Sequence, residues 1–311
     1  MPSMKRQAKS ISKRALRKIL EATQPLGFDL LPRHFYSEIP NLKDLKGDKS
    51  WRAPFSMKGV SGTDPEGQLE FIAACCPPPI VDELRTRDIH ALASSMNGES
   101  GFGPVEADLL FAFVATKRPE QIFQVGCGVS TAVCLLAADH AGYSPEILCV
   151  EPYPNEFLKQ SAEKRSISLI DKKIQTIDLS IIDDLGGDLL FFVDSSHTLG
   201  PSGEVSRIIL EMLPRLKKGA FVHFHDIKFP YDYDRHILHS TLFFHHESVL
   251  LHAFLTHNNR FSISASMSML HYANPDAVRE HLPTYRPAGN VDGLNASDGH
   301  FPSSTYLEVV G

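Results

Sequence analysis

The sequence has few cysteines, no long apolar run and no excess of basic charge. None of its five cysteines forms a Cys-x-x-Cys pair, and their number is odd. This argues against a zinc ribbon or a disulfide framework and favours reduced thiols in a cytoplasmic protein. No apolar run approaches the ~18–20 residues that a membrane-spanning helix needs. The first 20 residues hold seven Lys or Arg and lack the apolar stretch of a secretory signal.

The charge balance also narrows the range of partners. Against 31 Lys and Arg stand 37 Asp and Glu, so the net charge is −6 and no nucleic-acid partner is expected. With 42% hydrophobic residues among 311, the chain can bury a substantial core. Basic residues gather in 5–20 at spacings that predict an amphipathic helix. Its basic face either meets an acidic surface or membrane or, more commonly for such helices, is simply solvated.

The rhythm of apolar residues predicts an α/β fold. Strands are predicted at 121–126, 146–152, 173–177, 188–197, 219–227, 260–266 and 304–310. Helices are predicted at 66–76, 80–96, 105–118, 130–141, 155–164, 203–216 and 246–257, whereas 272–302 is expected to be mostly loop. Short apolar runs that alternate with helices are typical of a parallel sheet covered on both faces. We expect an N-terminal arm with cap or lid helices over 1–104 and the catalytic domain over 105–311.

A glycine turn and a later acid suggest a nucleoside-type cofactor. Gly126 and Gly128 lie where a strand turns into a helix, and Ser130 opens that helix, whose free N–H groups favour a ligand. Glu151 ends the next strand, 23 residues after Gly128, where a carboxylate can accept hydrogen bonds from a ribose diol. The third glycine of the dinucleotide fingerprint is replaced by Thr131, which favours a cofactor without a pyrophosphate.

These residues resemble a known family. The segments QVGCGVST, VEPYP, DLLFFVDSSH and LPRLKKGAFVHFHDI are similar to class I S-adenosylmethionine-dependent methyltransferases, closest to a branch from bacterial sugar, polysaccharide and natural-product pathways. The resemblance covers roughly 24–270. It implies a Rossmann-like, doubly wound seven-stranded sheet with an antiparallel last strand. It also implies that the Gly126–Gly128 turn holds the methionine end of S-adenosylmethionine and Glu151 its ribose. Gln124 stands where the family usually has an acid, and is the fifth predicted cofactor residue.

Two strand ends carry residues suited to chemistry. Asp194 and His197 follow the fourth predicted strand, and His225 and Asp226 end the fifth. Ligands of open α/β sheets bind beyond such carboxyl ends. Asp194 and Asp226, with His225, form a candidate site for a divalent metal, Mg²⁺ or Mn²⁺, with the imidazole shifting preference toward transition ions. His197 is the candidate general base. Alternatively, these side chains only hydrogen-bond the loops that close the cofactor pocket.

Several further residues are weaker candidates. Asn97 and Phe102 lie in a loop that the resemblance assigns as a lid over the cofactor, although a plain connecting loop fits equally well. Tyr231, Tyr233 and Arg235 follow the fifth strand and either contact an acceptor or only pack. Glu247 begins a helix that either lines the acceptor side or uses the carboxylate to stabilise its dipole. The neighbouring His245 and His246 are expected to face solvent.

The sequence therefore predicts transfer of a methyl group from S-adenosylmethionine to a hydroxyl of a saccharide or other small molecule. Two alternatives stay open: a metal-dependent hydroxylase built on His197, His225 and Asp194 or Asp226, and a non-catalytic cofactor-binding subunit. Neither the acceptor nor homo-oligomerisation follows from the sequence.

Overall fold

The computed structural model describes residues 4–233, 237–238, 242–286 and 302–311, and divides the chain into two compact units, Met1–Lys49 and Ser50–Gly311. The first unit contains helix α1 (Met4–Thr23), a short turn η1 (Gln24–Leu26) and helix α2 (Leu42–Gly47). The predicted helix at 5–20 is therefore confirmed.

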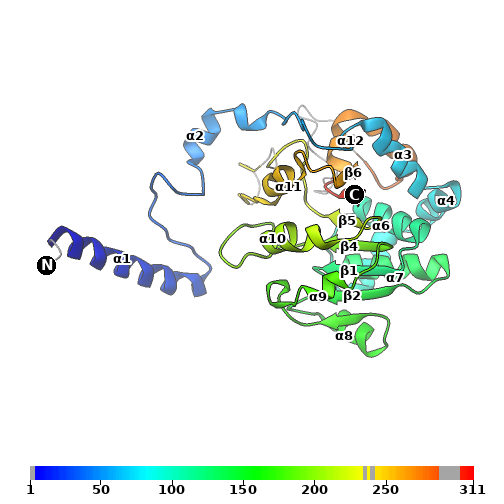
Figure 1. Ribbon diagram of the computed structural model, residues 1–311, viewed down its shortest axis with the longest axis horizontal. Helices are drawn as coiled ribbons and strands as arrows, with labels where there is room; N and C mark the ends of the chain where they lie inside the picture. Colours follow the sequence, from blue (N-terminus) through cyan, green and yellow to red (C-terminus); the bar gives the residue numbers. More distant parts are fainter. Residues whose placement is uncertain (1–3, 234–236, 239–241, 287–301) are drawn as a thin grey trace. The chain divides into compact units, whose positions relative to one another are not determined.

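The second unit is built around a seven-stranded sheet (Figure 1). Its strands are β1 (Gln121–Val125), β2 (Glu146–Val150), β3 (Ser168–Ile170), β4 (Leu189–Val193), β5 (Phe221–Phe224), β6 (Phe261–Ser266) and β7 (Thr305–Val309). Their order is β3-β2-β1-β4-β5-β7-β6, and β7 runs antiparallel to both β5 and β6. This confirms the predicted doubly wound sheet with an antiparallel last strand.

Alternation along the strands divides the core into two layers. In β4, Leu190 and Phe192 face one hydrophobic cluster, and Leu189, Phe191 and Val193 face the other. The first layer holds the helices α3 (Pro65–Cys75), α4 (Pro78–Thr86), α5 (Ile89–Asn97), α6 (Pro104–Lys117), α7 (Val129–Ala141), α8 (Glu156–Glu163), α12 (Met267–Ala273) and α13 (Pro275–His281). The second holds α9 (Ser180–Asp183), α10 (Glu204–Arg207), the π turn η4 (Ile208–Met212), the turn η5 (Leu213–Arg215) and α11 (Glu247–Leu255). Because both faces are covered, the central strand β4 is apolar throughout, and its neighbours β1 and β5 are largely buried.

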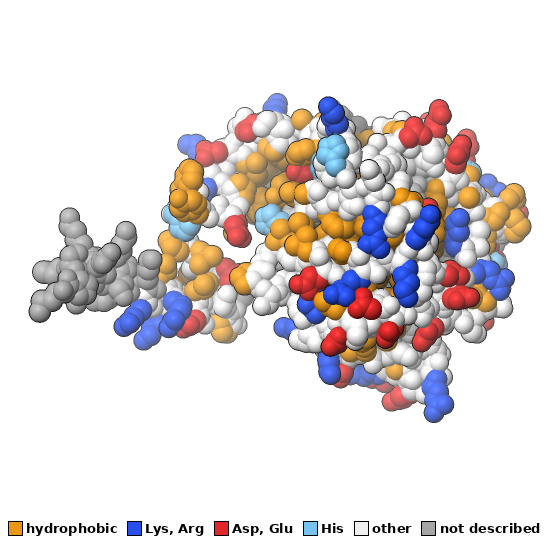
Figure 2. Space-filling view, in the orientation of Figure 1, with side chains coloured by type: hydrophobic (Ala, Val, Ile, Leu, Met, Phe, Trp, Pro, Cys, Tyr) orange, Lys and Arg blue, Asp and Glu red, His pale blue; other side chains and the backbone are white. Residues whose placement is uncertain are grey.

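The helices α3–α5 belong to the same compact unit as the sheet, because α5 packs on α7 and α3 packs on β6. The division into a cap before residue 105 and a catalytic domain after it concerns function and stays a prediction. On the face drawn in Figure 2, basic and acidic side chains of the second unit are interspersed. Within the described residues, no helix is both long and apolar enough to cross a membrane.

Four predicted elements differ from the structure. The third strand is at Ser168–Ile170, not 173–177, where a 3-10 turn (η3, Ile174–Thr176) buries Ile174 instead. The predicted helix at 80–96 is two helices, α4 and α5, because Asp88 caps the second by accepting from Ala91 N–H. The helix at 203–216 changes to π and 3-10 geometry after Arg207. The predicted loop at 272–302 contains α13, while 287–301 lies outside the described residues.

Candidate active site

The turn after β1 requires glycine at two positions. Gly126 has a φ of 80°, and a Cβ there would lie 1.9 Å from the carbonyl oxygen of Asp194. Gly128 has a φ of 156°, and a Cβ there would lie 3.3 Å from Oδ1 of Asn97. Bulkier residues would collide with the β4 end or with the loop above the turn. The backbone of this turn is therefore left open to a ligand.

A cavity of about 270 Å³ opens over this turn. It is lined by the turn, the start of α7, Glu151, Asp194 and the loop at 97–102; the residues are Asn97, Ser100, Gly101, Phe102, Gly126, Cys127, Gly128, Val129, Ser130, Glu151 and Asp194. Four of the five predicted cofactor residues, Gly126, Gly128, Ser130 and Glu151, are thus brought together. Residues Asn97 and Ser100–Phe102 of the loop line the cavity, and whether the loop acts as a lid or as a plain connection stays a prediction.

Glu151 is held at the edge of the cavity by backbone donors. One carboxylate oxygen accepts the N–H of Cys127 at 3.3 Å, and the other accepts the N–H of Tyr153 at 3.0 Å. Each carboxylate oxygen can accept more than one hydrogen bond, so capacity remains for a diol in the cavity. The position and chemistry of Glu151 fit the ribose of a nucleoside-type cofactor.

Gln124 does not reach the cavity. Its side chain is fully buried, where its amide donates to the Cys134 sulfur at 3.9 Å and accepts from the Cys149 thiol at 3.7 Å. A neutral amide is suited to this apolar, thiol-lined position, where an unpaired carboxylate would be costly. The prediction that Gln124 contacts the cofactor receives no support from this placement. All five cysteines are free, as expected.

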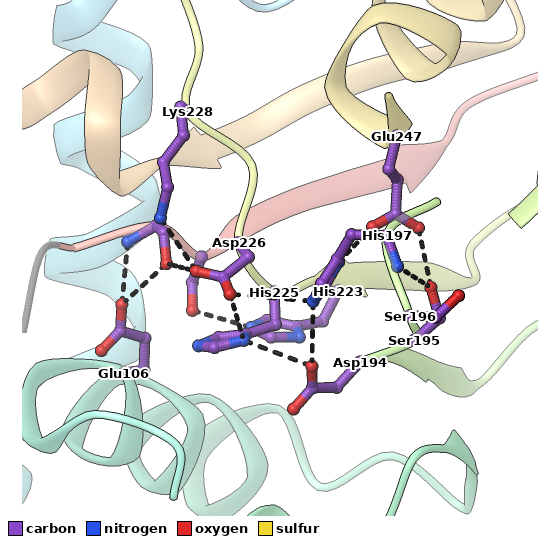
Figure 3. A network of polar contacts seen from close by, with 12 residues as sticks. Glu106, Asp194, Ser195, Ser196, His197, His223, His225, Asp226, Lys228 and Glu247 are labelled. Atoms are coloured by element: carbon purple, nitrogen blue, oxygen red, sulfur yellow. Dashed lines mark hydrogen bonds and ion pairs between the residues drawn. The ribbon is translucent and has the colours of Figure 1, made fainter. Parts of the chain in front are cut away.

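A cluster of two carboxylates and two imidazoles lies at the ends of β4 and β5 (Figure 3). His197 Nε2 is 3.6 Å from Asp194 Oδ1 and 3.7 Å from Asp226 Oδ2. His225 Nδ1 is 3.4 Å from the same Asp194 oxygen and 3.7 Å from the same Asp226 oxygen. We call these four residues the strand-end cluster. The sequence predicted all four, and the neighbouring strand ends bring them together as expected.

The cluster is held from outside by residues of other elements. The Nδ1 atom of His197 lies 2.6 Å from Oε2 of the buried Glu247, at the start of α11, and Glu247 Oε1 accepts from Ser195 Oγ at 3.2 Å. Asp226 Oδ1 accepts from Lys228 Nζ at 2.8 Å and from Ser303 Oγ at 3.1 Å. The contact with Glu247 leaves His197 Nε2 facing the other cluster residues, and the contacts with Lys228 and Ser303 leave Asp226 Oδ2 facing them.

The two carboxylates of the cluster raise the affinity of its imidazoles for a proton. Burial acts to lower the pKa of His197, but the Asp194 and Glu247 carboxylates beside it and the charge of Asp226 raise it to about 10. At His225 burial also acts to lower the pKa, but the charges of Asp194 and Asp226 raise it to about 9. For Asp194 and Asp226, burial would raise the pKa. The cations nearby, His225 for Asp194 and Lys228 for Asp226, nevertheless hold it well below the ordinary value.

Phe102 separates the cofactor cavity from His225. It lines the cavity, and its ring centroid lies 5.1 Å from that of His225 and 5.9 Å from that of His223. The two histidines lie on the same side of β5, as strand alternation predicted. His223, however, is not in the cluster: it is fully buried, stacks on Phe192 and shares a 2.9 Å hydrogen bond with Ser304 Oγ.

Other predicted residues have different surroundings from those expected. His245 and His246 are half-buried rather than solvent-facing, and the His245 ring lies 5.0 Å from that of His197. Tyr231 is buried against Tyr272. Tyr233 packs edge-on to His246, while Arg235 lies outside the described residues.

The sequence reasoning missed the residues that hold the cluster. Lys228 was not singled out, although it lies two residues after Asp226. Ser303 and the buried Glu106, which accepts the Ser303 N–H at 2.8 Å, were missed as well. Glu247 was weighed only as an acceptor-side or helix-dipole residue. A periodicity signal does not reveal such contacts, because they join α6, α11 and β7 to strand ends far away in sequence.

Comparison with known proteins finds similarity to a methyltransferase domain around the glycine turn. Residues 123–227 match the family model described as a methyltransferase domain. The chain is 28% identical over 186 residues to an uncharacterized protein of Archaeoglobus fulgidus, covering 57% of this chain and 80% of that protein. A solved structure, the SAH-bound Podospora anserina methyltransferase PaMTH1, aligns over 91% of this chain and all of its own at 14% identity, with a TM-score of 0.40.

The strand order, the antiparallel β7 and the open glycine turn describe a doubly wound α/β sheet, and residues 123–227 of it match a methyltransferase domain. Over these residues the chain is similar to methyltransferases.

Proposed function

We propose that the protein transfers a methyl group from S-adenosylmethionine to a hydroxyl of a sugar-like or other small-molecule acceptor. The observation that carries this is the position of Asp194. Its carboxylate belongs to the strand-end cluster, and the residue also lines the cavity over the glycine turn. A group that could orient a hydroxyl therefore borders the site where a methyl donor would lie.

The residues of the cavity fit the cofactor. When bound, S-adenosylmethionine supplies an electrophilic methyl group. The open backbone at Gly126 and Gly128 leaves room for its amino-acid end, Ser130 adds the start of α7, and Glu151 accepts from its ribose. Asn97 and Phe102 line the cavity and would help to exclude water around a bound cofactor. Methyl transfer needs mainly alignment of donor, methyl and nucleophile.

The cluster would act on the acceptor. Asp194 and His197 are the residues that we expect to position its hydroxyl and to handle its proton. Asp194, His225 and Asp226 offer the oxygens and nitrogen that a divalent cation such as Mg²⁺ or Mn²⁺ prefers. Such an ion would lower the pKa of a bound hydroxyl. The side chains of Tyr233 and His246 lie near the same end of the sheet as candidate acceptor contacts.

The test combines binding with turnover. Calorimetry with S-adenosylmethionine and S-adenosylhomocysteine should show one site, and a methyl-labelled donor should label a member of a panel of hydroxylated sugars and small molecules. Turnover is compared in EDTA and after return of Mg²⁺ or Mn²⁺. Binding of NAD in preference to the methyl donor would overturn the proposal, and full activity in EDTA would remove the ion from it.

One observation favours a second function. Asp194, His197 and His225 place two imidazoles and a carboxylate within 4.8 Å of one another, which is the ligand set of non-haem iron oxygenases. Oxygen consumption that requires Fe²⁺ and an organic substrate, without methyl transfer, would support a hydroxylase instead.

A further inference from the structure

We infer that His197 is itself a metal ligand, through Nε2. It would complete a four-residue centre with Asp194, His225 and Asp226 that takes a transition ion (Mn²⁺, Fe²⁺, Co²⁺ or Zn²⁺) in preference to Mg²⁺. The inference rests on the proposed function in that the centre borders the cofactor cavity through Asp194. It changes the role of His197 from a base that meets the acceptor directly to a residue that acts through the ion.

The distances fit one shared ion. The candidate atoms of Asp194, His197 and His225 lie within 4.8 Å of one another. The four imidazole-to-carboxylate separations in the strand-end cluster are 3.4, 3.6, 3.7 and 3.7 Å. Ligands arranged tetrahedrally at ~2.1 Å from an ion are roughly 3.4 Å apart. The four separations are longer than typical N–H···O hydrogen bonds, the shortest only slightly so, and all four are close to the spacing of atoms that coordinate one ion.

His225 provides a second, independent observation. Its Nδ1 atom is buried and has no hydrogen-bond partner among the described residues, although it faces both carboxylates. Buried polar atoms without a partner are rare in folded proteins, because each loses its hydration without replacement. A cation between His225 Nδ1 and the two carboxylate oxygens would satisfy it.

Outer contacts orient two of the four ligands, His197 and Asp226, toward the rest of the cluster (Figure 3). Glu247 Oε2 lies 2.6 Å from His197 Nδ1. In the neutral imidazole that a metal binds, Nδ1 would donate to Glu247 and Nε2 would carry the lone pair for the metal. Lys228 and Ser303 bind Oδ1 of Asp226, which leaves its Oδ2 facing both histidines. A carboxylate behind a ligating imidazole is the usual outer support of a metal site. Glu247 is therefore a positioning residue.

The ligand set selects the ion. Mg²⁺ prefers oxygen ligands and retains water, whereas imidazole nitrogen suits Mn²⁺, Fe²⁺, Co²⁺ and Zn²⁺ with affinity that rises toward the end of the series. Two imidazoles beside two carboxylates therefore favour a transition ion. A site that used only Asp194 and Asp226 would show the opposite preference.

The experiment measures metal binding without turnover. The full-length chain is stripped with EDTA and titrated with Co²⁺ by visible absorption, then with Zn²⁺, Mn²⁺ and Mg²⁺ by calorimetry. Wild type is compared with His197→Gln, Glu247→Gln and the control His281→Gln, a half-buried histidine at the end of α13. Affinity for S-adenosylhomocysteine and circular dichroism are recorded on the same samples.

We expect one Co²⁺ per chain, Mg²⁺ bound at least 100-fold more weakly, and no change in His281→Gln. His197→Gln should weaken Co²⁺ binding by 100-fold or more and change its absorption spectrum. Glu247→Gln should weaken it by about 10–100-fold, the usual effect of losing an outer partner, with the spectrum retained. Wild-type affinity and spectrum in His197→Gln would overturn the assignment, as would equal affinity for Mg²⁺ and Zn²⁺.

Failure of this inference is distinguishable from failure of the proposed function. A chain that binds S-adenosylhomocysteine but no transition ion refutes the centre and leaves the methyltransferase proposal standing. A chain that binds Co²⁺ through His197 but not S-adenosylhomocysteine supports the centre and refutes the proposed donor. A His197→Gln chain that loses its circular dichroism signal is replaced in the comparison by Glu247→Gln, whose unchanged Co²⁺ affinity would count against the centre.

Discussion

Glu151 lies at the edge of the cavity with both carboxylate oxygens already oriented by backbone N–H groups. Replacing it with alanine removes charge-assisted hydrogen bonds to a ribose. We expect Glu151→Ala to weaken S-adenosylmethionine binding by roughly 1.5–3 kcal/mol, which calorimetry measures. The exposed Glu163, at the end of α8, provides the control, and Glu163→Ala should bind normally. Equal affinity in the two variants would refute the ribose assignment.

Asp108 is a buried acid away from the cavity. Burial raises its pKa to about 7, although the hydrogen bond from Thr284 Oγ1 at 2.6 Å acts in the other direction. The unfolded carboxyl ionises near pH 4, so the folded state loses stability as the pH rises from there to about 7 and levels off above it.

Asp108→Asn should remove that dependence. Between pH 5 and pH 8 we expect the free energy of unfolding of the wild type to fall by roughly 2–3 kcal/mol relative to the variant. The fall occurs over the two pH units between pH 5 and the folded pKa of about 7. Urea unfolding at the two pH values measures this, with Asp139→Asn, an exposed site on α7, as control. A constant gap between wild type and Asp108→Asn would contradict the assignment.

Among the elements, the turn between β1 and α7 is the most constrained. Gly126 and Gly142 both have positive φ, 80° and 63°, but a Cβ meets the Asp194 carbonyl at 1.9 Å in the first and nothing within 4 Å in the second. Gly142→Ala should therefore cost about 1 kcal/mol, the penalty of a left-handed residue alone. Gly126→Ala should cost clearly more and abolish cofactor binding, as thermal unfolding and calorimetry would show. A similar loss of stability in Gly126→Ala and Gly142→Ala would mean that the turn after β1 can shift to make room for a Cβ, and would contradict this prediction.

The elements also show how far sequence reasoning reaches. β4 is a fully apolar run and β1 and β2 are mostly apolar. The ends of β2 and β4 place Glu151 and Asp194 by a general rule of parallel sheets. β3 was misplaced because Ser168–Ile170 is short and only partly buried, while the apolar pair Ile174 and Ile177 lies in a turn.

The cluster was predictable from strand ends alone, but its supports were not. Glu247 lies 50 positions after His197 in the sequence. It reaches His197 only because its helix, α11, packs against the η4 turn on the same face of the sheet. Ser303 reaches Asp226 because β7 inserts between β5 and β6. Such contacts depend on tertiary placement, which local periodicity does not encode. Gln124 illustrates the converse: its place in the motif suggested a cofactor contact, whereas its amide lies among cysteine sulfurs.

For the whole molecule, the division into two units predicts where stability resides. Both hydrophobic clusters lie within Ser50–Gly311, and among the described residues none before Met57 belongs to either. A chain that starts at Ser50 should therefore fold cooperatively and bind S-adenosylhomocysteine within about two-fold of the full-length affinity. Circular dichroism melting and calorimetry test this. A melting temperature lower by more than ~5 °C would show that residues 1–49 contribute to the fold.

Asp194 is one residue with two duties, since it lines the cofactor cavity and its carboxylate belongs to the strand-end cluster. Its backbone carbonyl also occupies the space next to Gly126, so a shift of Asp194 would change both the cavity and the cluster. Thermodynamic linkage then applies: whatever factor the cofactor imposes on the affinity of the cluster for its occupant, that occupant imposes on the cofactor in return. If the cavity holds the methyl donor and the cluster acts on the acceptor, as we propose, the two sites are coupled through a single residue and each should report on the occupancy of the other.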